Sequence, residues 1–334
     1  MGNLSGYQRG DVVEVKSFNE ILSSLDAEGK LEGMPFMPEM ARYCGRRFHV
    51  NRRANKTCVE GFPLRRLERT VFLEGLRCDG SAHDGCQRGC TLFWKEAWLR
   101  PCGGDVPPAR TRHAPRDARP HAEREEYLGE EAAAGNHPCR SVEDLPTRKD
   151  DRFFCQSTEL AEATLGDFPR WNLRHYLRDL VRGEITLPWL ARMIWRSVQN
   201  KVRRRLGLGL IEHVEGCQPD PPRGDLDLQP GQWVEVKSAE EIRTLIDGEG
   251  KNHGLSFELE MLQHCGRRCQ VAYPIRKVIL EEPGRQATGK MVALTNTVVL
   301  EGVACRGLCM KNCPRANFFW WREAWLRRVM PQKP

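Results

Sequence analysis

The sequence predicts a mainly β protein with α additions, built from two tandem copies of a small barrel that a helical segment joins. Three observations predict this fold: an internal repeat, short runs that alternate apolar and polar residues, and a cysteine cluster at the end of each repeat. Residues 11–50 align without a gap onto residues 232–271, and both ranges contain the runs VEVKS, EGK and CGRR. So many coincidences in one register indicate an internal duplication.

Both copies predict the same order of elements. Gly10 and Gly231 precede runs in which valines alternate with polar residues, as in a strand with one buried face. In the first copy an amphipathic helix follows near residues 20–25, and then comes a glycine-containing turn. A second helical turn ends at Cys44, where Gly45 suits the left-handed position after a helix. Further short strands lead to the cysteine cluster, so each copy is expected to form a small, curved sheet.

Composition divides the chain into four predicted segments. These are a first cysteine-rich repeat at 7–102, a flexible linker rich in Pro, Arg and Ala at 103–150, a helical bridging segment at 151–215, and a second repeat at 229–330. The linker has too few large apolar residues to offset the chain entropy lost on folding. The bridging segment carries an apolar stripe with a basic opposite face. It is expected to pack on the barrels, with an anionic lipid, a nucleic acid or a protein partner as alternatives.

Fourteen cysteines in 334 residues are the most informative part of the composition. The chain opens with no secretory leader, and no apolar run approaches the roughly 20 residues of a membrane span. We therefore expect a cytoplasmic protein, in which thiols stay reduced and clustered cysteines bind metal more often than they form disulfides. The net charge of +7 permits contact with nucleic acid but does not require it.

The cysteine clusters predict one metal site in each repeat. The spacing is Cys-x7-Cys-x3-Cys in the first copy and Cys-x3-Cys-x3-Cys in the second. The predicted ligands are Cys44, Cys78, Cys86 and Cys90 in the first repeat, and Cys265, Cys305, Cys309 and Cys313 in the second, with Cys269 as an alternative to Cys309. Four thiolates suit a closed, structural zinc site. Iron, an iron–sulfur centre, or buried thiols without a metal are the alternatives.

Two further residues are candidates for chemistry. His83 lies within the first cluster and has no counterpart in the second copy, so it is either a solvated loop residue or a ligand that replaces a cysteine. Cys155 stands apart from both clusters in sequence, and it is a candidate catalytic thiol, a metal ligand or a buried free thiol. The tryptophans beside each cluster are expected to fill the core, with a stacking platform for bases as the alternative.

The fold resembles the SH3-like barrel through residues 10–15, which read GDVVEV, and residues 45–50, which read GRRFHV. The whole pattern also resembles an uncharacterised bacterial family with two cysteine-rich repeats, over roughly residues 10–100 and 155–330. That resemblance implies an architecture of tandem SH3-like barrels and brings no settled activity.

Three hypotheses for function follow. The first is a zinc-stabilised binding or scaffold protein whose partner is another protein or a carrier-bound substrate. The second is a metal- or thiol-dependent enzyme of a bacterial biosynthetic pathway, with its site between the repeats and the Cys155 segment. The third is a nucleic-acid-binding protein that uses barrel faces and the arginine-rich helix. The sequence leaves open whether the protein is an enzyme.

Overall fold

The computed structural model describes residues 6–103, 141–169, 173–181, 183, 185–207, 214–281, 289–307 and 312–330. In these ranges the protein is mainly β, with curled antiparallel sheets that form half-barrels. The chain divides into two compact units, of which unit 1 comprises Met1–Glu184, Lys277–Val292 and Cys313–Arg315, and unit 2 comprises Ile185–Arg276, Ala293–Asn312 and Ala316–Pro334. Two stretches of the predicted second repeat therefore belong to unit 1. The predicted linker at 103–150 lies mostly outside the described residues.

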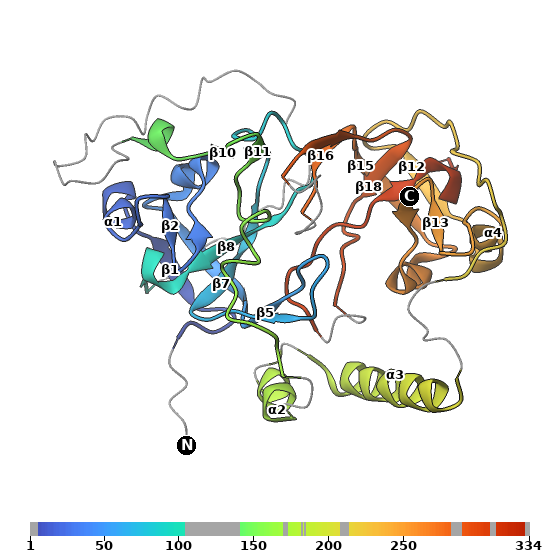
Figure 1. Cartoon of the computed structure of the whole chain (residues 1–334), viewed down its shortest axis with the longest axis horizontal. Coiled ribbons are helices and arrows are strands. Elements are labelled where there is room, and N and C mark those ends of the chain that lie inside the picture. Colours follow the sequence, from blue (N-terminus) through green and yellow to red (C-terminus); the bar gives the residue numbers. More distant parts are fainter. Residues whose placement is uncertain are drawn as a thin grey trace. The chain divides into compact units, whose positions relative to one another are not determined.

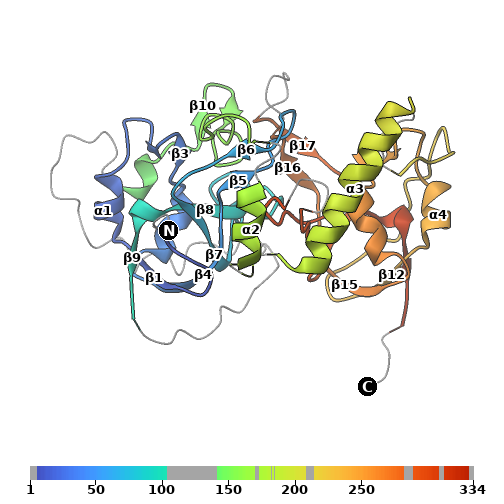
Figure 2. The ribbon, with the colours of Figure 1, turned by 90° about the horizontal axis from the view of Figure 1, so that it is seen from below.

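Unit 1 is built around a five-stranded antiparallel sheet with the strand order β8-β7-β4-β1-β9 (Figures 1 and 2). Its strands are β1 (Val12–Val15), β4 (Arg47–Arg53), β7 (Thr70–Arg77), β8 (Thr91–Lys95) and β9 (Leu99–Pro101). Short hairpins pair β2 (Lys30–Leu31) with β3 (Met34–Pro35), β5 (Lys56–Thr57) with β6 (Arg65–Arg66), β10 (Arg148–Lys149) with β11 (Arg152–Phe153), and β16 (Lys277–Ile279) with β17 (Met291–Ala293). The helices are α1 (Phe18–Leu22), α2 (Leu173–Val181) and the 3-10 helices η1 (Pro38–Tyr43), η2 (Glu96–Trp98) and η4 (Val142–Asp144).

The start of unit 1 follows the sequence pattern closely. Val13 and Val15 of β1 are fully buried while Glu14 between them is partly exposed, which is the predicted alternation. Ser17 then caps α1 in a capping box, because its hydroxyl accepts from the Glu20 N–H at 3.4 Å and the Glu20 carboxylate accepts from the Ser17 N–H at 3.0 Å. After η1, Gly45 has a φ of 71°, the left-handed position predicted for it.

Replacing Ser17 with alanine is expected to destabilise unit 1 by about 1 kcal/mol, because the Glu20 N–H at the start of α1 loses the hydroxyl that accepts from it. Ser23→Ala is the matched control, since the Ser23 hydroxyl only donates to the Glu20 carbonyl oxygen at the other end of α1. Chemical denaturation of both variants measures the difference. Equal losses in the two variants would contradict the capping role.

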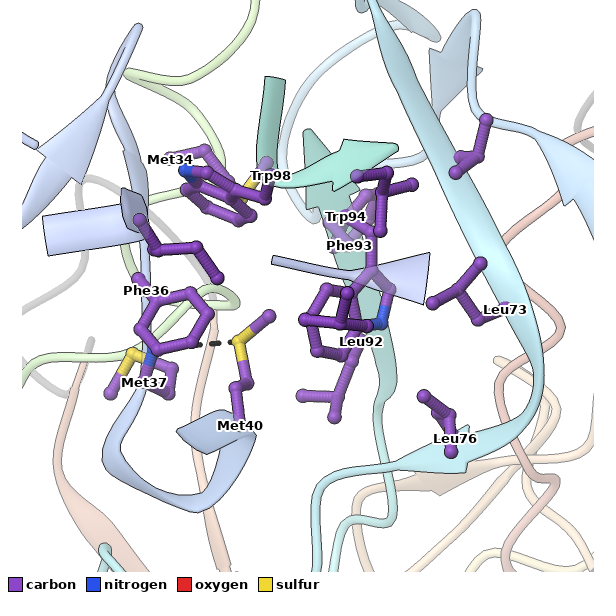
Figure 3. Packing of buried hydrophobic residues seen from close by; sticks show 14 of the residues in the cluster. Met34, Phe36, Met37, Met40, Leu73, Leu76, Leu92, Phe93, Trp94 and Trp98 are labelled. Atoms are coloured by element: carbon purple, nitrogen blue, oxygen red, sulfur yellow. Dashed lines mark hydrogen bonds between the residues drawn. The ribbon is translucent and has the colours of Figure 1, made fainter. Parts of the chain in front are cut away.

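The core of unit 1 is aromatic and sulfur-rich (Figure 3). Trp94 and Trp98 are fully buried, and the ring of Phe36 meets both edge-on at centroid distances of 6.3 and 5.3 Å. Met37, which precedes η1, and Met40 of η1 pack into the same cluster. These tryptophans fill the core, as the sequence predicts. Their burial leaves neither ring face available for stacking on a base.

Unit 2 contains a second five-stranded antiparallel sheet, with the order β19-β18-β15-β12-β20. Its strands are β12 (Trp233–Val236), β15 (Arg268–Pro274), β18 (Thr297–Leu300), β19 (Trp321–Arg322) and β20 (Leu326–Arg328). The other elements are α3 (Leu187–Arg205), α4 (Ala239–Arg243), the hairpin of β13 (Lys251–Asn252) and β14 (Leu255–Ser256), and the 3-10 helices η5 (Leu259–His264) and η6 (Glu323–Trp325). The apolar stripe of α3 is exposed, for example Ile194 at 49% and Val198 at 48%, instead of packed as expected.

The two sheets correspond strand by strand. In unit 1 Val13 pairs with Phe48 and Pro101, and in unit 2 Val234 pairs with Cys269 and Arg328. The long central strand of each sheet shows a register shift at the same place, after Val50 in β4 and after Val271 in β15. In unit 1 Cys78, which follows β7, contacts Glu39 of η1, and in unit 2 Cys305, beyond β18, contacts Glu260 of η5.

Candidate metal centre

Three side chains of metal-binding type meet at the end of β7 in unit 1. Glu39 comes from η1, Cys78 directly follows β7, and His83 comes from the loop between β7 and β8. The Cys78 thiol donates to Glu39 Oε1 at 3.1 Å, and His83 Nδ1 lies 3.7 Å from the same oxygen. One potential ligand atom from each residue lies within 4.8 Å of the other two. This spacing allows all three atoms to face one bound ion.

The loop between β7 and β8 is shaped by glycines. Gly80 has a φ of 73°, and a Cβ there would lie 2.0 Å from the Cys86 carbonyl oxygen, so no other residue fits. The Gly80 carbonyl oxygen accepts from the N–H groups of His83 and Gly85, each at 2.9 Å. The Cys86 N–H in turn donates to the His83 carbonyl oxygen at 3.0 Å. These turns fold the loop back on itself and aim His83 inward.

His83 is held in one orientation by its buried surroundings. Its side chain is 1% exposed, and Nε2 lies 3.2 Å from the Phe154 carbonyl oxygen. A carbonyl oxygen can only accept, so Nε2 donates to it, and Nδ1 is the ring nitrogen on the side of Glu39 that can bind an ion. A backbone carbonyl that fixes one ring nitrogen is the usual outer partner of a metal-binding histidine. The predicted alternative of a solvated loop histidine does not fit this burial.

Four cysteines line one small cavity beside this group. The cavity has a volume of about 30 Å³, and its lining includes Cys78, Cys86, Cys90 and Cys155 together with Glu39 and His83. That volume holds about two water-sized species. Cys90 is near each of the other three cysteines. Its charge contributes to raising the pKa of Cys78, Cys86 and Cys155. The Cys90 thiol also lies 3.2 Å from the Ser157 hydroxyl.

Burial disfavours the ionised form of these thiols in the absence of a cation. Burial, followed by the charge of Cys90, raises the pKa of Cys155 to about 12. Burial first, and then Glu39 and Cys90, raises the pKa of Cys78 well above its ordinary value. A nucleophilic cysteine needs the opposite shift, toward an accessible thiolate. A cation bound among the sulfurs would favour the thiolate over the thiol, since metal coordination deprotonates a thiol.

A buried network of opposite charges borders the cysteines. Glu281 is fully buried and accepts from two guanidinium groups, Arg88 Nη2 at 2.7 Å and Arg315 Nη2 at 2.8 Å. Arg88 lines the cavity, and Arg315 Nη2 also donates to the Ser157 hydroxyl at 2.9 Å. The charge of Cys90 is among the causes that raise the pKa of both arginines. Arg88 Nη2 also donates to Glu60 Oε1 at 2.9 Å, so the network beside the sulfurs consists of two guanidiniums and two carboxylates.

The structure gathers most of the predicted ligands of the first repeat, with two differences. Cys78, Cys86 and Cys90 line the cavity, whereas Cys44 ends η1 within the apolar core cluster and is absent from the cavity lining. Burial raises the pKa of Cys44 to about 12. Cys155 lines the cavity instead. Sequence reasoning missed Glu39, although its match with Glu260 in the second copy was a signal that could have found it.

The predicted ligands of the second repeat are spread over several places. In unit 2 the Cys305 thiol donates to Glu260 Oε2 at 3.5 Å, the counterpart of the Cys78–Glu39 contact. Cys265 ends η5, and Cys269 lies in β15 opposite Val234. Cys309 lies outside the described residues. Within the described residues, the metal-binding group of three is the one in unit 1.

Cys313 belongs to unit 1, where Cys58 is one of its neighbours. Its sulfur accepts a hydrogen bond from the N–H of Cys58 at 3.1 Å. The position of Cys313 follows from its neighbours in the sequence, because contacts of Arg315 hold this segment in unit 1. The Arg315 carbonyl oxygen accepts from the Thr91 hydroxyl at 2.8 Å, and the Arg315 side chain is bound by Glu281.

Comparisons of the chain with models of protein families, with curated protein sequences and with solved structures find no match. Among the helices of the described residues, none is both long and apolar enough to cross a membrane.

Proposed function

We propose that unit 1 holds a structural zinc ion and that the chain is a zinc-stabilised binding or scaffold protein. The observation that carries this proposal is the meeting of Glu39, Cys78 and His83 at a cavity that further cysteines line. Cysteine sulfur and histidine nitrogen are the ligands that zinc prefers in structural sites. The proposed ligands are Cys78, His83 and Cys90, with either Cys86 or Cys155 in the fourth position.

The loop sequence supports this set. From Cys78 the spacing is Cys-x4-His-x2-Cys-x3-Cys, so one short loop supplies most of the ligands. The sulfur atoms also have outer partners of the expected kind. The Ile279 N–H donates to Cys86 Sγ at 3.4 Å, and Ser157 lies beside Cys90. With three thiolates, one neutral imidazole and Zn²⁺, the site would carry one net negative charge beside Arg88 and Arg315.

The size of the cavity favours a structural ion over a catalytic one. A catalytic zinc keeps one position open for water and substrate, and organic substrates need pockets of several hundred Å³. A cavity of about 30 Å³, lined by four cysteines, Glu39 and His83 among other residues, suits a bound ion better than an organic substrate. The enzyme hypothesis retains one supporting observation, that Cys155 lies at the cavity, but burial and a raised pKa make this thiol a better ligand than nucleophile.

The corresponding strand orders and registers of the two sheets support a tandem duplication of an SH3-like half-barrel. The repeated carboxylate–thiol contact, Glu39 with Cys78 and Glu260 with Cys305, supports the same view. A duplicated β-scaffold without a substrate-sized cavity at its metal suits binding better than catalysis. The proposed partner is a protein or a carrier-bound molecule, and the proposed compartment is the cytoplasm.

Elemental analysis of the purified full-length protein tests the proposal. We expect one zinc per chain in unit 1, and a thermal midpoint that falls when a strong chelator removes the ion and recovers when zinc is restored. A protein purified without metal, and unchanged in its thermal midpoint by either chelator or zinc, would overturn the structural-zinc proposal. A site that gains iron instead of zinc would correct the identity of the ion.

A further inference from the structure

The helix α3 of unit 2 is the longest helix of the described residues, and its exposed face is apolar (Figure 2). With 3.6 residues per turn, the large apolar side chains on this face fall within an arc of about 120° that runs the length of the helix. Each is between 48% and 68% exposed. They are Leu187, Ile194, Trp195, Val198, Val202 and Leu206, and we call them the α3 stripe.

The opposite face of α3 is the one that the rest of the protein partly covers. It carries Trp189 and Met193 together with Arg196, Asn200 and Arg203, and each of these residues is of intermediate exposure. A helix on a globular protein ordinarily turns its apolar stripe inward and its charged residues outward. In α3 two arginines lie on the partly covered face while the α3 stripe faces solvent. A contiguous exposed stripe of this kind marks an interaction surface.

The charge of α3 indicates the kind of surface that covers the stripe. Within Leu187–Arg205 the helix contains five arginines and one lysine, and it contains no aspartate or glutamate. Arg192 and Lys201 are exposed and flank the α3 stripe on its two sides. Trp195, with an apolar ring and one N–H donor, is of the residue type that favours the boundary between headgroups and acyl chains. A surface that is anionic outside and apolar beneath complements all of these features.

We propose that α3 binds the surface of an anionic lipid bilayer and lies parallel to it. The α3 stripe enters the boundary with the acyl chains, and Arg192 and Lys201 reach the headgroup phosphates. Helices with a basic polar face and with Trp and Leu on the apolar face bind membranes in this way. A nucleic acid is bound mainly through its phosphates and would leave the apolar stripe in water. Because α3 belongs to unit 2, the inference does not rest on the zinc site proposed for unit 1.

Sedimentation of the full-length protein with lipid vesicles tests the inference. The vesicles contain phosphatidylcholine and phosphatidylserine in equal amounts, and vesicles of phosphatidylcholine alone are the comparison. We expect stronger partition onto the mixed vesicles, and this preference should shrink as salt is added, because salt screens the attraction between the helix and the lipid charges. Arg192→Gln should lower the partition coefficient on the mixed vesicles about fivefold, since it removes one basic group near the anionic surface.

The double variant Trp195→Gln, Val198→Gln tests the apolar stripe without a change of charge. Both side chains are exposed, so the fold should tolerate the change, but partition onto the mixed vesicles should fall by about tenfold or more. Ser197→Gln is the matched control, because Ser197 is an exposed residue of the same helix that lies outside the α3 stripe. This control should bind as the unmutated protein does.

Hydrogen exchange of the unmutated protein gives a second readout that depends on no variant. The backbone amides of residues 187–205 should exchange more slowly in the presence of the mixed vesicles than in free protein. An unmutated protein that does not sediment with the mixed vesicles at low salt would overturn the inference. Equal partition of the double variant and the unmutated protein would also overturn it, as would exchange over residues 187–205 that duplex DNA slows and the vesicles do not.

Discussion

Replacing Cys78 with serine is expected to release the metal from unit 1 and to cost the protein about 3 kcal/mol or more of stability. Cys78 is the residue that joins the sheet to the site, because it directly follows β7 and contacts Glu39 of η1. A serine hydroxyl has nearly the same shape but does not ionise to a soft ligand. Mutation of a residue that only hydrogen-bonds to a metal ligand lowers metal affinity by roughly 10–100-fold. Loss of a ligand itself should lower the affinity for zinc by more than that.

Cys102→Ser is the matched control for that variant. Cys102 is also a thiol of unit 1, but its sulfur donates only to the neighbouring Gly103 carbonyl oxygen at 3.6 Å and lies outside the cavity. We expect normal zinc content and a normal thermal midpoint for Cys102→Ser. Zinc content by elemental analysis and unfolding by denaturant measure both effects. A Cys78→Ser protein that retains full zinc content would remove Cys78 from the ligand set.

Replacing Glu281 with glutamine is expected to destabilise unit 1 by about 3–5 kcal/mol, because it leaves two buried guanidiniums without their shared anion. Glu281 is 0% exposed, and it accepts from both Arg88 and Arg315. The glutamine has the same shape, so packing changes little and the loss reports on charge. Arg88 also lines the metal cavity, so weaker zinc binding should accompany the loss of stability.

Glu60→Gln provides the control, since Glu60 binds the same Arg88 at 2.9 Å but its side chain is 48% exposed. An exposed pair contributes about 0–1 kcal/mol, so this variant should unfold at nearly the normal denaturant concentration. Denaturant unfolding of both variants makes the comparison. If Glu60→Gln costs as much as Glu281→Gln, burial is not what makes the Glu281 contacts strong.

Local patterns in the sequence predicted the elements of the fold. Alternation identified β1, the glycine after Cys44 identified the end of η1, and the aromatic runs identified the tryptophans of the core. The exposed stripe of α3 was not predicted, because an apolar helix face indicates burial only when a partner surface covers it. The exchange of Lys277–Val292 and Cys313–Arg315 into unit 1 was also beyond prediction, since no local signal tells which unit a connecting segment joins.

The sequence predicted the candidate site only in part, because local spacing places residues of one loop together but does not encode long-range contacts. Cys78, Cys86 and Cys90 share one loop, so their proximity follows from spacing. Cys155 reaches the cavity through a long-range contact that spacing does not encode. Cys44 was expected to be a ligand because it ends a helix near the central strands, but its side chain packs into the apolar core. Glu39 escaped notice because a single glutamate on a helical turn is ordinarily a solvated residue.

X-ray absorption at the zinc edge of the purified protein tests the central claim most directly. The account predicts sulfur neighbours at about 2.3 Å together with one nitrogen at about 2.0–2.1 Å, and it predicts that His83→Ala removes the nitrogen signal. A protein that binds no zinc, or a zinc surrounded by oxygen alone, would contradict the account.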